Sequence, residues 1–219
     1  MRILFVRVSC QKEKNLWPRL RRHKFQQVII CGDPKLKTNY KLEDDVLYLK
    51  CRDGYDALPE KMIAAFNAIL EIEEFKNVNR FLKLDSDNML RSSCMVSRDQ
   101  TILKYDYVGQ RIWWLRNGDN PREYHFSRVS KDSYWYQRKY EGEMVPYVDG
   151  GCSYVLSRRA LKLITKEYGF DKLEEVYKNH IYEDVMVGLL LKKHNITPHK
   201  TIYNISGDKK ISIGLSNLR

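Results

Sequence analysis

Short apolar runs alternate with stretches of helical spacing along the first half of the chain. Four of the runs have the length of a strand, and most are rich in Val, Ile and Leu, which is typical of strands buried on both faces. They are RILFVRV (2–8), QQVIICG (26–32), DVLYLKC (45–51) and NRFLKLDSD (79–87). Between the last two, apolar residues recur at helical spacing after Pro59, which suits a first helical turn. This order predicts an α/β fold with a largely parallel sheet.

The second half of the chain is less regular. Three more strands are predicted there, at YDYVGQRI (105–112), CSYVLS (152–157) and TIYNIS (201–206). Helices are predicted from Arg158 and after the acidic pair Glu183-Asp184. Residues 113–147 are aromatic and charged and give no clear period.

Composition indicates a folded protein with anionic partners. The chain has 219 residues, 43% of them hydrophobic, and a net charge of +11. Such a charge favours nucleic acid, an acidic membrane surface or a phosphorylated small molecule, although a merely solvated face has the same composition. No run approaches the length of a membrane span and no signal-peptide pattern opens the chain, so we expect a cytoplasmic protein. The cysteines are odd in number and lack a CxxC pair, which favours reduced thiols: Cys10, Cys31, Cys51, Cys94 and Cys152.

Two carboxylates follow the apolar run FLKL, with Asp85 and Asp87 separated by Ser86. Ligands of open α/β sheets bind outside the carboxyl ends of the strands, where two carboxylates can approach one divalent ion. Mg²⁺ or Mn²⁺ takes oxygen ligands and could bridge the pair to a diphosphate. A polar turn after a strand has the same pattern, so this motif alone does not decide.

Two further motifs have both a structural and a functional interpretation. In YVDGGCSYVLS (147–157), Gly150 and Gly151 allow a backbone to approach a ligand closely, or simply a tight turn. Glu183 and Asp184 open a predicted helix, where acids are stabilised by the helix dipole and often only cap the helix. A general base at the rim of a site is the functional alternative.

Four motifs follow one another between residues 53 and 188. They are Asp53-Gly54-Tyr55 with Leu58 and Lys61, then LKLDSD (82–87), then Tyr134-Trp135-Tyr136 before VPYVDGGCSYVLSRRAL (145–161), and finally EDVMVG (183–188). Their order resembles the β1,3-galactosyltransferase and N-acetylglucosaminyltransferase family, which includes the Fringe enzymes. The resemblance covers about residues 26–195.

The resemblance implies a single GT-A domain over residues 1–219, with a nucleotide-binding half (1–90) and an acceptor-binding half (91–219). It implies a metal-dependent, inverting transfer from a UDP-sugar to a hydroxyl of a glycan or glycoconjugate, with Mn²⁺ or Mg²⁺ as cofactor. Asp184 is then the base, and Glu183 caps the helix or holds the acceptor.

The resemblance also assigns residues to the two substrates. On the donor side it places Asp53, Tyr55, Lys61, Asp85, Ser86, Asp87, Gly150 and Gly151. Asp85 and Asp87 would hold the metal, with His199 as a candidate third ligand. Trp135 and Asp149 are assigned to the acceptor, and Trp113, Trp114 and Trp135 could stack on sugar faces or pack in a core or lid.

The chain departs from the family pattern in places. Ser86 stands where the family has a middle Asp, and the C-terminal segment ISIGLSNLR lacks the family's late His. Two other classes of protein stay open. A basic nucleic-acid-binding protein would have this charge, but no zinc-finger spacing or RNP-like motif is present. A metal-dependent nuclease or phosphotransferase could use the acidic pair, but a Walker loop and a third clustered acid are missing.

Overall fold

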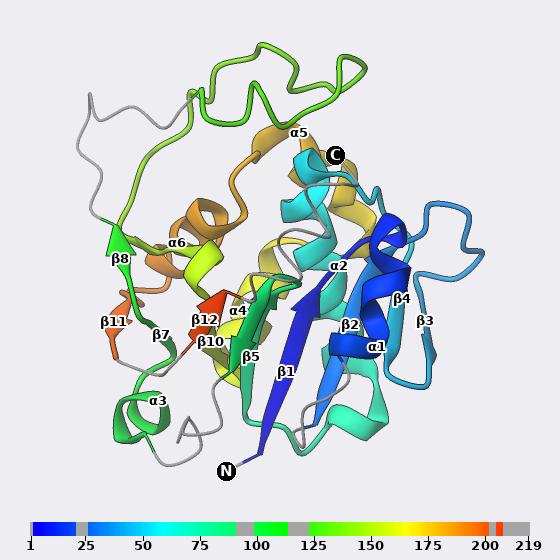
Figure 1. Ribbon diagram of the computed structural model, residues 1–219. Coiled ribbons are helices and arrows are strands. Elements are labelled where there is room, and N and C mark those ends of the chain that lie inside the picture. Colours follow the sequence, from blue (N-terminus) through cyan, green and yellow to red (C-terminus); the bar gives the residue numbers. More distant parts are fainter. Residues whose placement is uncertain (1, 21–25, 91–98, 114–122, 202–204, 208–219) are drawn as a thin grey trace.

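The computed structural model describes residues 2–20, 26–90, 99–113, 123–201 and 205–207 (Figure 1). Eight strands form the central sheet: β1 (Ile3–Val8), β2 (Gln27–Gly32), β3 (Tyr40–Glu43), β4 (Val46–Leu49), β5 (Arg80–Asp85), β7 (Tyr107–Gly109), β10 (Tyr154–Ser157) and β11 (His199–Lys200). Their order is β11-β7-β10-β5-β1-β2-β4-β3. Two small sheets pair β6 (Asn88–Leu90) with β12 (Ile205–Gly207), and β8 (Ile112–Trp113) with β9 (Tyr147–Val148).

The sheet is mostly parallel, as the apolar runs predict. Parallel ladders join β1 to β2, β1 to β5, β2 to β4 and β7 to β11. The strand β10 lies antiparallel between β5 and β7, and β3 is antiparallel to β4 at the edge. Because β10 runs against β5, the segment that precedes β10 lies at the same edge of the sheet as the carboxyl end of β5.

Helices cover both faces of the sheet (Figure 1). They are α1 (Trp17–Leu20), α2 (Leu58–Glu71), α3 (Gln100–Lys104), α4 (Arg158–Glu167), α5 (Leu173–Asn179) and α6 (Glu183–Lys192). The larger core packs α2, α4, α5 and α6 against one face, and α1 and α3 pack in smaller clusters against the other. Successive strand residues point to opposite faces, so a strand between two such layers is apolar throughout.

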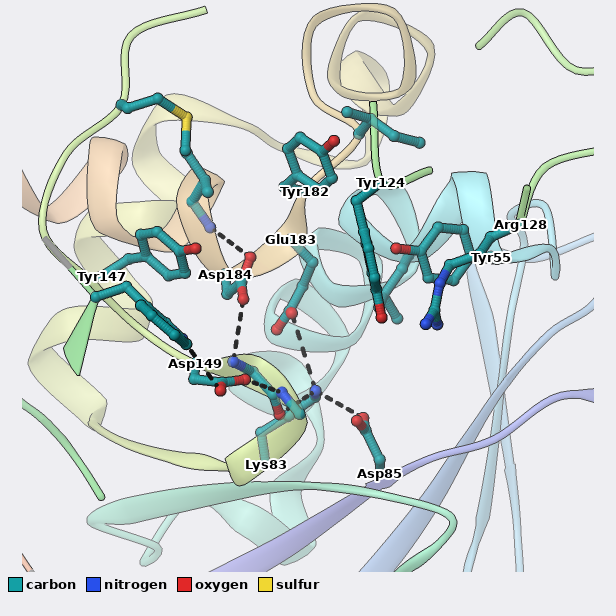
Figure 2. A pocket seen from close by; sticks show the side chains of 17 residues that line it. Tyr55, Lys83, Asp85, Tyr124, Arg128, Tyr147, Asp149, Tyr182, Glu183 and Asp184 are labelled. Atoms are coloured by element: carbon teal, nitrogen blue, oxygen red, sulfur yellow. Dashed lines mark hydrogen bonds and ion pairs between the residues drawn. The ribbon is translucent and has the colours of Figure 1, made fainter. Parts of the chain in front are cut away.

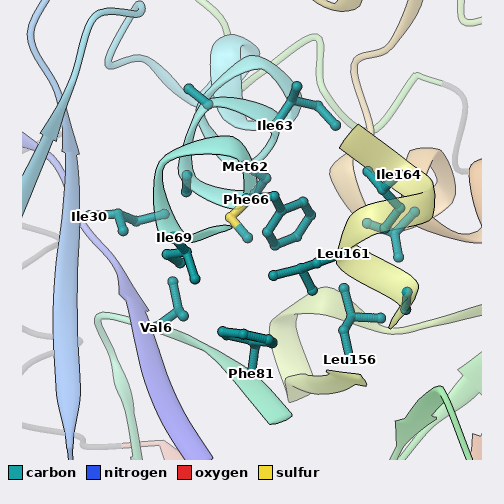
Figure 3. Packing of buried hydrophobic residues seen from close by; sticks show 14 of the residues in the cluster. Val6, Ile30, Met62, Ile63, Phe66, Ile69, Phe81, Leu156, Leu161 and Ile164 are labelled. Carbon is teal, nitrogen blue, oxygen red and sulfur yellow. The ribbon is translucent and has the colours of Figure 1, made fainter. Parts of the chain in front are cut away.

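The larger core lies between α2, α4 and the sheet (Figure 3). Phe66 of α2 is 1% exposed and lies in this core with Phe81 of β5 and Leu161 of α4. The helix α4 begins where the Ser157 side chain accepts a hydrogen bond from the Ala160 N–H at 3.0 Å. These contacts hold β5, from the first half of the chain, and α4, from the second half, against one core.

Most predicted elements are confirmed, with local differences. The predicted strand 105–112 is divided into β7 and β8, because the chain leaves the main sheet after Gly109 and β8 pairs with β9. A β-carbon on Gly109 would lie 2.0 Å from the Val148 side chain, so the two segments meet closely there. Of the predicted strand 201–206, residues 202–204 lie outside the described residues, and β12 begins at Ile205. The division into halves at residue 90 stays a prediction.

The sequence predicts no membrane-spanning segment and reduced cysteines, and the structure bears on both predictions. Within the described ranges, no helix combines the length and the apolar character that a membrane crossing requires. The four cysteines in these ranges, Cys10, Cys31, Cys51 and Cys152, are unpaired, as predicted. Cys94 lies outside them.

Candidate active site

A cavity of about 590 Å³ lies at the edge of the sheet where β5 ends and α6 begins (Figure 2). It brings together seven of the residues that the sequence singled out: Tyr55, Asp85, Asp149, Gly150, Gly151, Glu183 and Asp184. They come from four separate segments, since Tyr55 precedes α2, Asp85 ends β5, the glycines precede β10 and the acids open α6. Trp113, 41% exposed, also lines the cavity.

Lys83 links three of these segments, although sequence analysis did not single it out. Its side chain is 2% exposed, and its Nζ lies 2.6 Å from Asp85 Oδ1, 2.8 Å from the Gly150 carbonyl oxygen and 3.9 Å from Glu183 Oε2. Burial alone lowers the pKa of Lys83, but the charges of Asp85 and Glu183 outweigh that effect and raise it. A charged lysine thus joins β5, the glycine turn and α6 beneath the cavity.

Glu183 faces into the protein. Its side chain is 3% exposed and accepts a short hydrogen bond from the Tyr154 hydroxyl. Burial raises the pKa of Glu183 to about 7, and the nearby Lys83 opposes this shift. The carboxylate is held by side chains from β5 and β10, and its contacts among the described residues include none to an N–H group of the helix.

Asp184 is half-buried and lines the cavity. Its Oδ2 accepts a hydrogen bond from the Gly150 N–H at 3.1 Å, and its Oδ1 accepts one from the Val185 N–H at 2.9 Å. Burial raises the pKa of Asp184, while these N–H donors oppose the shift. A carboxylate oriented by backbone donors, with a raised pKa, is suited to take a proton near neutral pH.

Asp149 and Trp113 form another part of the wall. The Asp149 Oδ2 accepts a hydrogen bond from Trp113 Nε1 at 3.1 Å and lies 3.4 Å from Arg111 Nη1. Asp149 Oδ1 accepts from the Gly151 N–H at 3.0 Å. The indole is therefore held at the cavity by a carboxylate, with much of its surface exposed.

Three predicted contact residues lie away from the cavity. Lys61 is 2% exposed and its Nζ lies 2.7 Å from Asp53 Oδ1 and 2.8 Å from the Ser9 carbonyl oxygen. Asp53 also accepts a hydrogen bond from the Gly32 N–H, so this pair fixes the loops after β1, β2 and β4. Trp135 is 5% exposed and donates to the Tyr177 carbonyl oxygen, so it packs in a core as the alternative predicted. Trp114 lies outside the described residues.

The structure does not bring His199 together with Asp85 and Asp87, the proposed metal ligands. His199 is in β11 and stacks on Tyr105, with ring centres 3.5 Å apart. Two strands, β7 and β10, separate β11 from β5, so His199 lies roughly 14 Å across the sheet from the strand that carries Asp85. A shared metal ion is therefore excluded for this His in the structure described.

Of the two carboxylates Asp85 and Asp87, only one lies on the cavity wall. Asp85 lines the cavity, whereas Asp87 is half-buried in the turn before β6 and Ser86 is buried. The described part of the chain has no group of three or more His, Cys, Asp or Glu side chains placed to hold an ion. Carboxylate oxygens are nonetheless the ligand type that Mg²⁺ and Mn²⁺ prefer, and Mg²⁺ often takes only one or two carboxylates plus substrate phosphates. Metal binding stays a prediction.

Gly150 is required for close packing under the cavity, which gives a testable prediction. A β-carbon there would lie 2.7 Å from Glu183 Oε2 and 3.2 Å from Asp184 Cβ. We expect Gly150→Ala to lower the free energy of unfolding by about 1–3 kcal/mol, measured by urea denaturation. Gly151→Ala is the matched control, since its β-carbon would meet only Asp149 Oδ1 at 3.3 Å. Equal stability of both variants would contradict this explanation.

Sequence analysis assigned no role in the site to several cavity residues: Lys83, Tyr124, Arg128, Met144, Tyr147 and Tyr182. Lys83 alone had a usable signal, because a lysine inside an apolar strand needs a buried anionic partner. The others come from the aromatic region 113–147, or adjoin a motif, and only the folded chain shows that they meet.

Comparisons with known proteins give the family. The sequence pattern of the galactosyltransferase family matches residues 33–201. The human UDP-GalNAc:beta-1,3-N-acetylgalactosaminyltransferase 2 is 24% identical over 157 residues, covering 72% of this chain and 28% of that protein. The chain therefore spans less than a third of that relative. A solved structure titled as A197 from STIV is 15% identical, with a TM-score of 0.45 over 92% of this chain and 82% of that one.

The family match covers well over half of the chain and includes all four motifs up to α6. The α/β domain with its mostly parallel eight-stranded sheet agrees with the GT-A domain that the resemblance implied. The chain therefore belongs to the galactosyltransferase family, a family of glycosyl-transferring enzymes.

Proposed function

We propose that the protein transfers a hexose from a UDP-sugar to a hydroxyl of a glycan or glycoconjugate, with inversion at the anomeric carbon, and that this cavity is its active site. The observation that supports this best is that Asp85, from the end of β5, and Asp184, from the first turn of α6, line one cavity. Asp85, at a strand end, is placed to hold an ion that would bind the donor diphosphate. Asp184 is placed to take a proton from the acceptor.

Asp184 is the proposed base. Its carboxylate takes the proton of the acceptor hydroxyl while the hydroxyl oxygen forms a bond to the anomeric carbon. The bond from that carbon to the diphosphate oxygen breaks on the opposite face, and UDP leaves with the electron pair. Asp184 is more exposed than Glu183, whose carboxylate is already held by Tyr154 and Lys83, so Asp184 is the acid available to substrate.

Asp85 and Asp87 are the proposed protein residues that would hold a divalent ion. When bound, Mn²⁺ or Mg²⁺ would neutralise the negative charge of the diphosphate. Lys83 holds Asp85 Oδ1 at 2.6 Å and so orients this carboxylate before any substrate binds.

Other residues acquire indirect or acceptor roles in this proposal. Lys61 and Asp53 position the loops around the donor instead of contacting phosphate, because Lys61 is buried. Trp113 offers an exposed ring to a sugar of the acceptor, and Asp149 holds its indole. The name of the human relative specifies UDP-GalNAc, which makes this nucleotide sugar the first donor to test.

Calorimetric titration with UDP and UDP-GalNAc, in Mn²⁺ and in EDTA, tests the donor half of the proposal. We expect binding in Mn²⁺ and loss of most of that affinity in EDTA, because an ion held by these carboxylates would supply positive charge for the diphosphate. Asp87→Ala should lose the metal-dependent part of the affinity and keep the fold, measured by circular dichroism. Equal UDP affinity in Mn²⁺ and EDTA would contradict the metal-dependent donor site.

A further inference from the structure

Arg128 lies on the cavity wall in an arrangement unlike that of Lys83. Its guanidinium carbon is 4.0 Å from the centre of the Tyr124 ring and 5.6 Å from that of Tyr55, and all three residues line the cavity (Figure 2). Whereas Lys83 is surrounded by carboxylates, no ion pair or side-chain hydrogen bond joins Arg128 to another described residue. A guanidinium stacked on an aromatic face keeps its in-plane N–H donors available for an anion.

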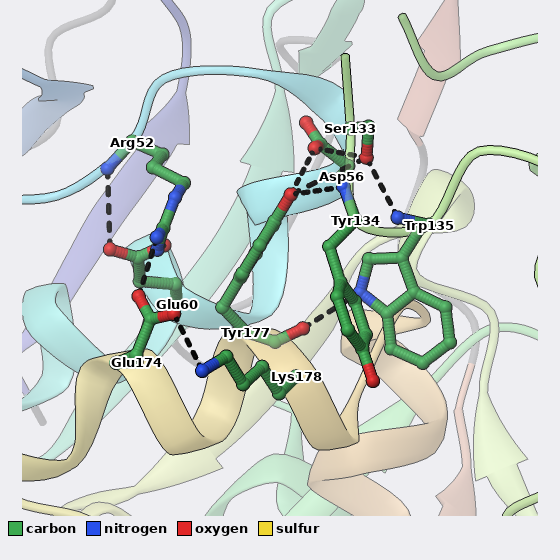
Figure 4. A network of polar contacts seen from close by, with 9 residues as sticks. All are labelled: Arg52, Asp56, Glu60, Ser133, Tyr134, Trp135, Glu174, Tyr177 and Lys178. Carbon is green, nitrogen blue, oxygen red and sulfur yellow. Dashed lines mark hydrogen bonds and ion pairs between the residues drawn. The ribbon is translucent and has the colours of Figure 1, made fainter. Parts of the chain in front are cut away.

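The segment that carries Arg128 is anchored at several points. His125 is fully buried, with Nδ1 2.9 Å from the Tyr182 hydroxyl and Nε2 2.7 Å from the Arg138 carbonyl oxygen. Further along, Ser133 donates a hydrogen bond to Asp56 at 2.6 Å (Figure 4). Tyr182 lines the cavity and Asp56 follows the cavity residue Tyr55, so the segment is held in register with the site. Arg128 is thereby placed without the help of a ligand.

The Trp135 side chain strengthens the same anchor. Its indole Nε1 donates to the Tyr177 carbonyl oxygen at 2.7 Å, and the Tyr177 hydroxyl donates to Asp56 Oδ2 at 2.8 Å (Figure 4). One polar network thus joins the segment to α5 and to the turn that carries Tyr55. This network holds Asp56, next to Tyr55, and the anchored His125 is next to Tyr124, so little backbone order must be gained on binding an anion.

The charges around the cavity indicate which ligand would use Arg128. Four carboxylates and two cations line the cavity, and one of these cations, Lys83, is already occupied by Asp85 and the Gly150 carbonyl. A diphosphate brought there needs positive charge in addition to an ion held by acids. Arginine presents a planar pair of donors that matches two phosphate oxygens, and charge-assisted hydrogen bonds of this kind are the strong ones.

We propose that Arg128 binds the diphosphate of the donor and is a specificity-determining residue for nucleoside diphosphates over the free nucleoside. This inference rests on the proposed function, since it names a residue for the donor of that reaction. Tyr55 and Tyr124 hold the guanidinium over the cavity, and Arg128 approaches the phosphate oxygens from the wall opposite Asp149 (Figure 2).

Arg138 provides a matched control within the same segment. Its guanidinium carbon lies 4.1 Å from the centre of the Tyr134 ring, so it repeats the arginine-on-tyrosine stack, but it borders a different hollow and does not line the cavity. Affinities of UDP, uridine and inorganic pyrophosphate in Mn²⁺ are measured for the wild type, Arg128→Gln, Arg128→Lys and Arg138→Gln, by calorimetry or, for weak binding, by NMR titration.

We expect Arg128→Gln to weaken the binding of UDP and of pyrophosphate about ten- to one-hundredfold. The affinity for uridine should stay unchanged. Arg128→Lys should recover part of the loss, and Arg138→Gln should match the wild type. Unchanged UDP affinity in Arg128→Gln, or an equal loss for UDP and uridine, would overturn the inference, the latter because it indicates a merely structural role. A wild type that binds pyrophosphate through Arg128 but not UDP would instead contradict the proposed donor and keep the anion site.

Discussion

Replacing Asp184 by Asn should lower the rate of sugar transfer by about two to four orders of magnitude while donor binding is kept. The amide has nearly the same shape, and its oxygen can still accept the Gly150 N–H bond that orients Asp184. It cannot accept a proton at neutral pH, so the acceptor hydroxyl loses its base. The measurement is kcat for UDP release with acceptor present, beside the affinity for UDP.

Glu183→Gln is the control for Asp184→Asn. Its amide oxygen can still accept from Tyr154, so we expect a smaller loss of rate. Burial raises the pKa of Asp184 above the ordinary value, about 3.9 for an aspartate. Since the base works deprotonated, the rate should rise with pH through that raised pKa. Near-normal transfer by Asp184→Asn with an inactive Glu183→Gln would assign the base to Glu183.

Replacing Lys83 by Met should destabilise the fold by about 3–5 kcal/mol, because it leaves the buried Glu183 carboxylate and the partly exposed Asp85 carboxylate without their cation. Asp85 and Glu183 lie 2.6 Å and 3.9 Å from its Nζ, and Glu183 is almost completely buried. The free energy of unfolding from urea denaturation measures this. The double variant Lys83→Met/Glu183→Gln should recover part of the loss, because one uncompensated charge is removed with its partner.

Lys61→Met is the matched control for the lysine change. Lys61 is equally buried, but its partner Asp53 keeps hydrogen bonds from the Gly32 and Gln11 N–H groups, whereas the almost completely buried Glu183 would lose its cation with Lys83. We therefore expect a smaller loss of stability than for Lys83→Met. A Lys83→Met variant as stable as the wild type would show that the buried lysine does not hold the site together.

The strands and helices that carry the site could be predicted from periodicity. The apolar run before Asp85 and the apolar helical pattern after Asp184 each place one acid at a terminus of a regular element. Their meeting in one cavity depends on β10 lying antiparallel beside β5, since this brings Gly150 under α6. Strand order of this kind is set by long-range packing, which the local pattern does not contain.

Side-chain environment was harder to predict than element type. A tryptophan on a sugar and a tryptophan in a core look alike in sequence, and Trp135 is in a core while Trp113 is exposed at the cavity. Lys61 and Lys83 both follow a helix or strand pattern, but their buried partners come from distant segments. Arg128 had no signal at all, because its importance comes from the anchored segment that holds it beside Tyr55.

NMR analysis of a reaction of the protein with UDP-GalNAc and a glycan acceptor, in Mn²⁺, tests whether the protein transfers the sugar with inversion at the anomeric carbon. We expect free UDP together with a new glycoside whose anomeric configuration is inverted relative to the donor, and much slower product formation by Asp184→Asn. Appearance of UMP with a sugar phosphate would indicate phosphotransfer, and a glycoside of retained configuration would exclude Asp184 as the base of a single displacement. Either result would contradict inverting sugar transfer with Asp184 as the base.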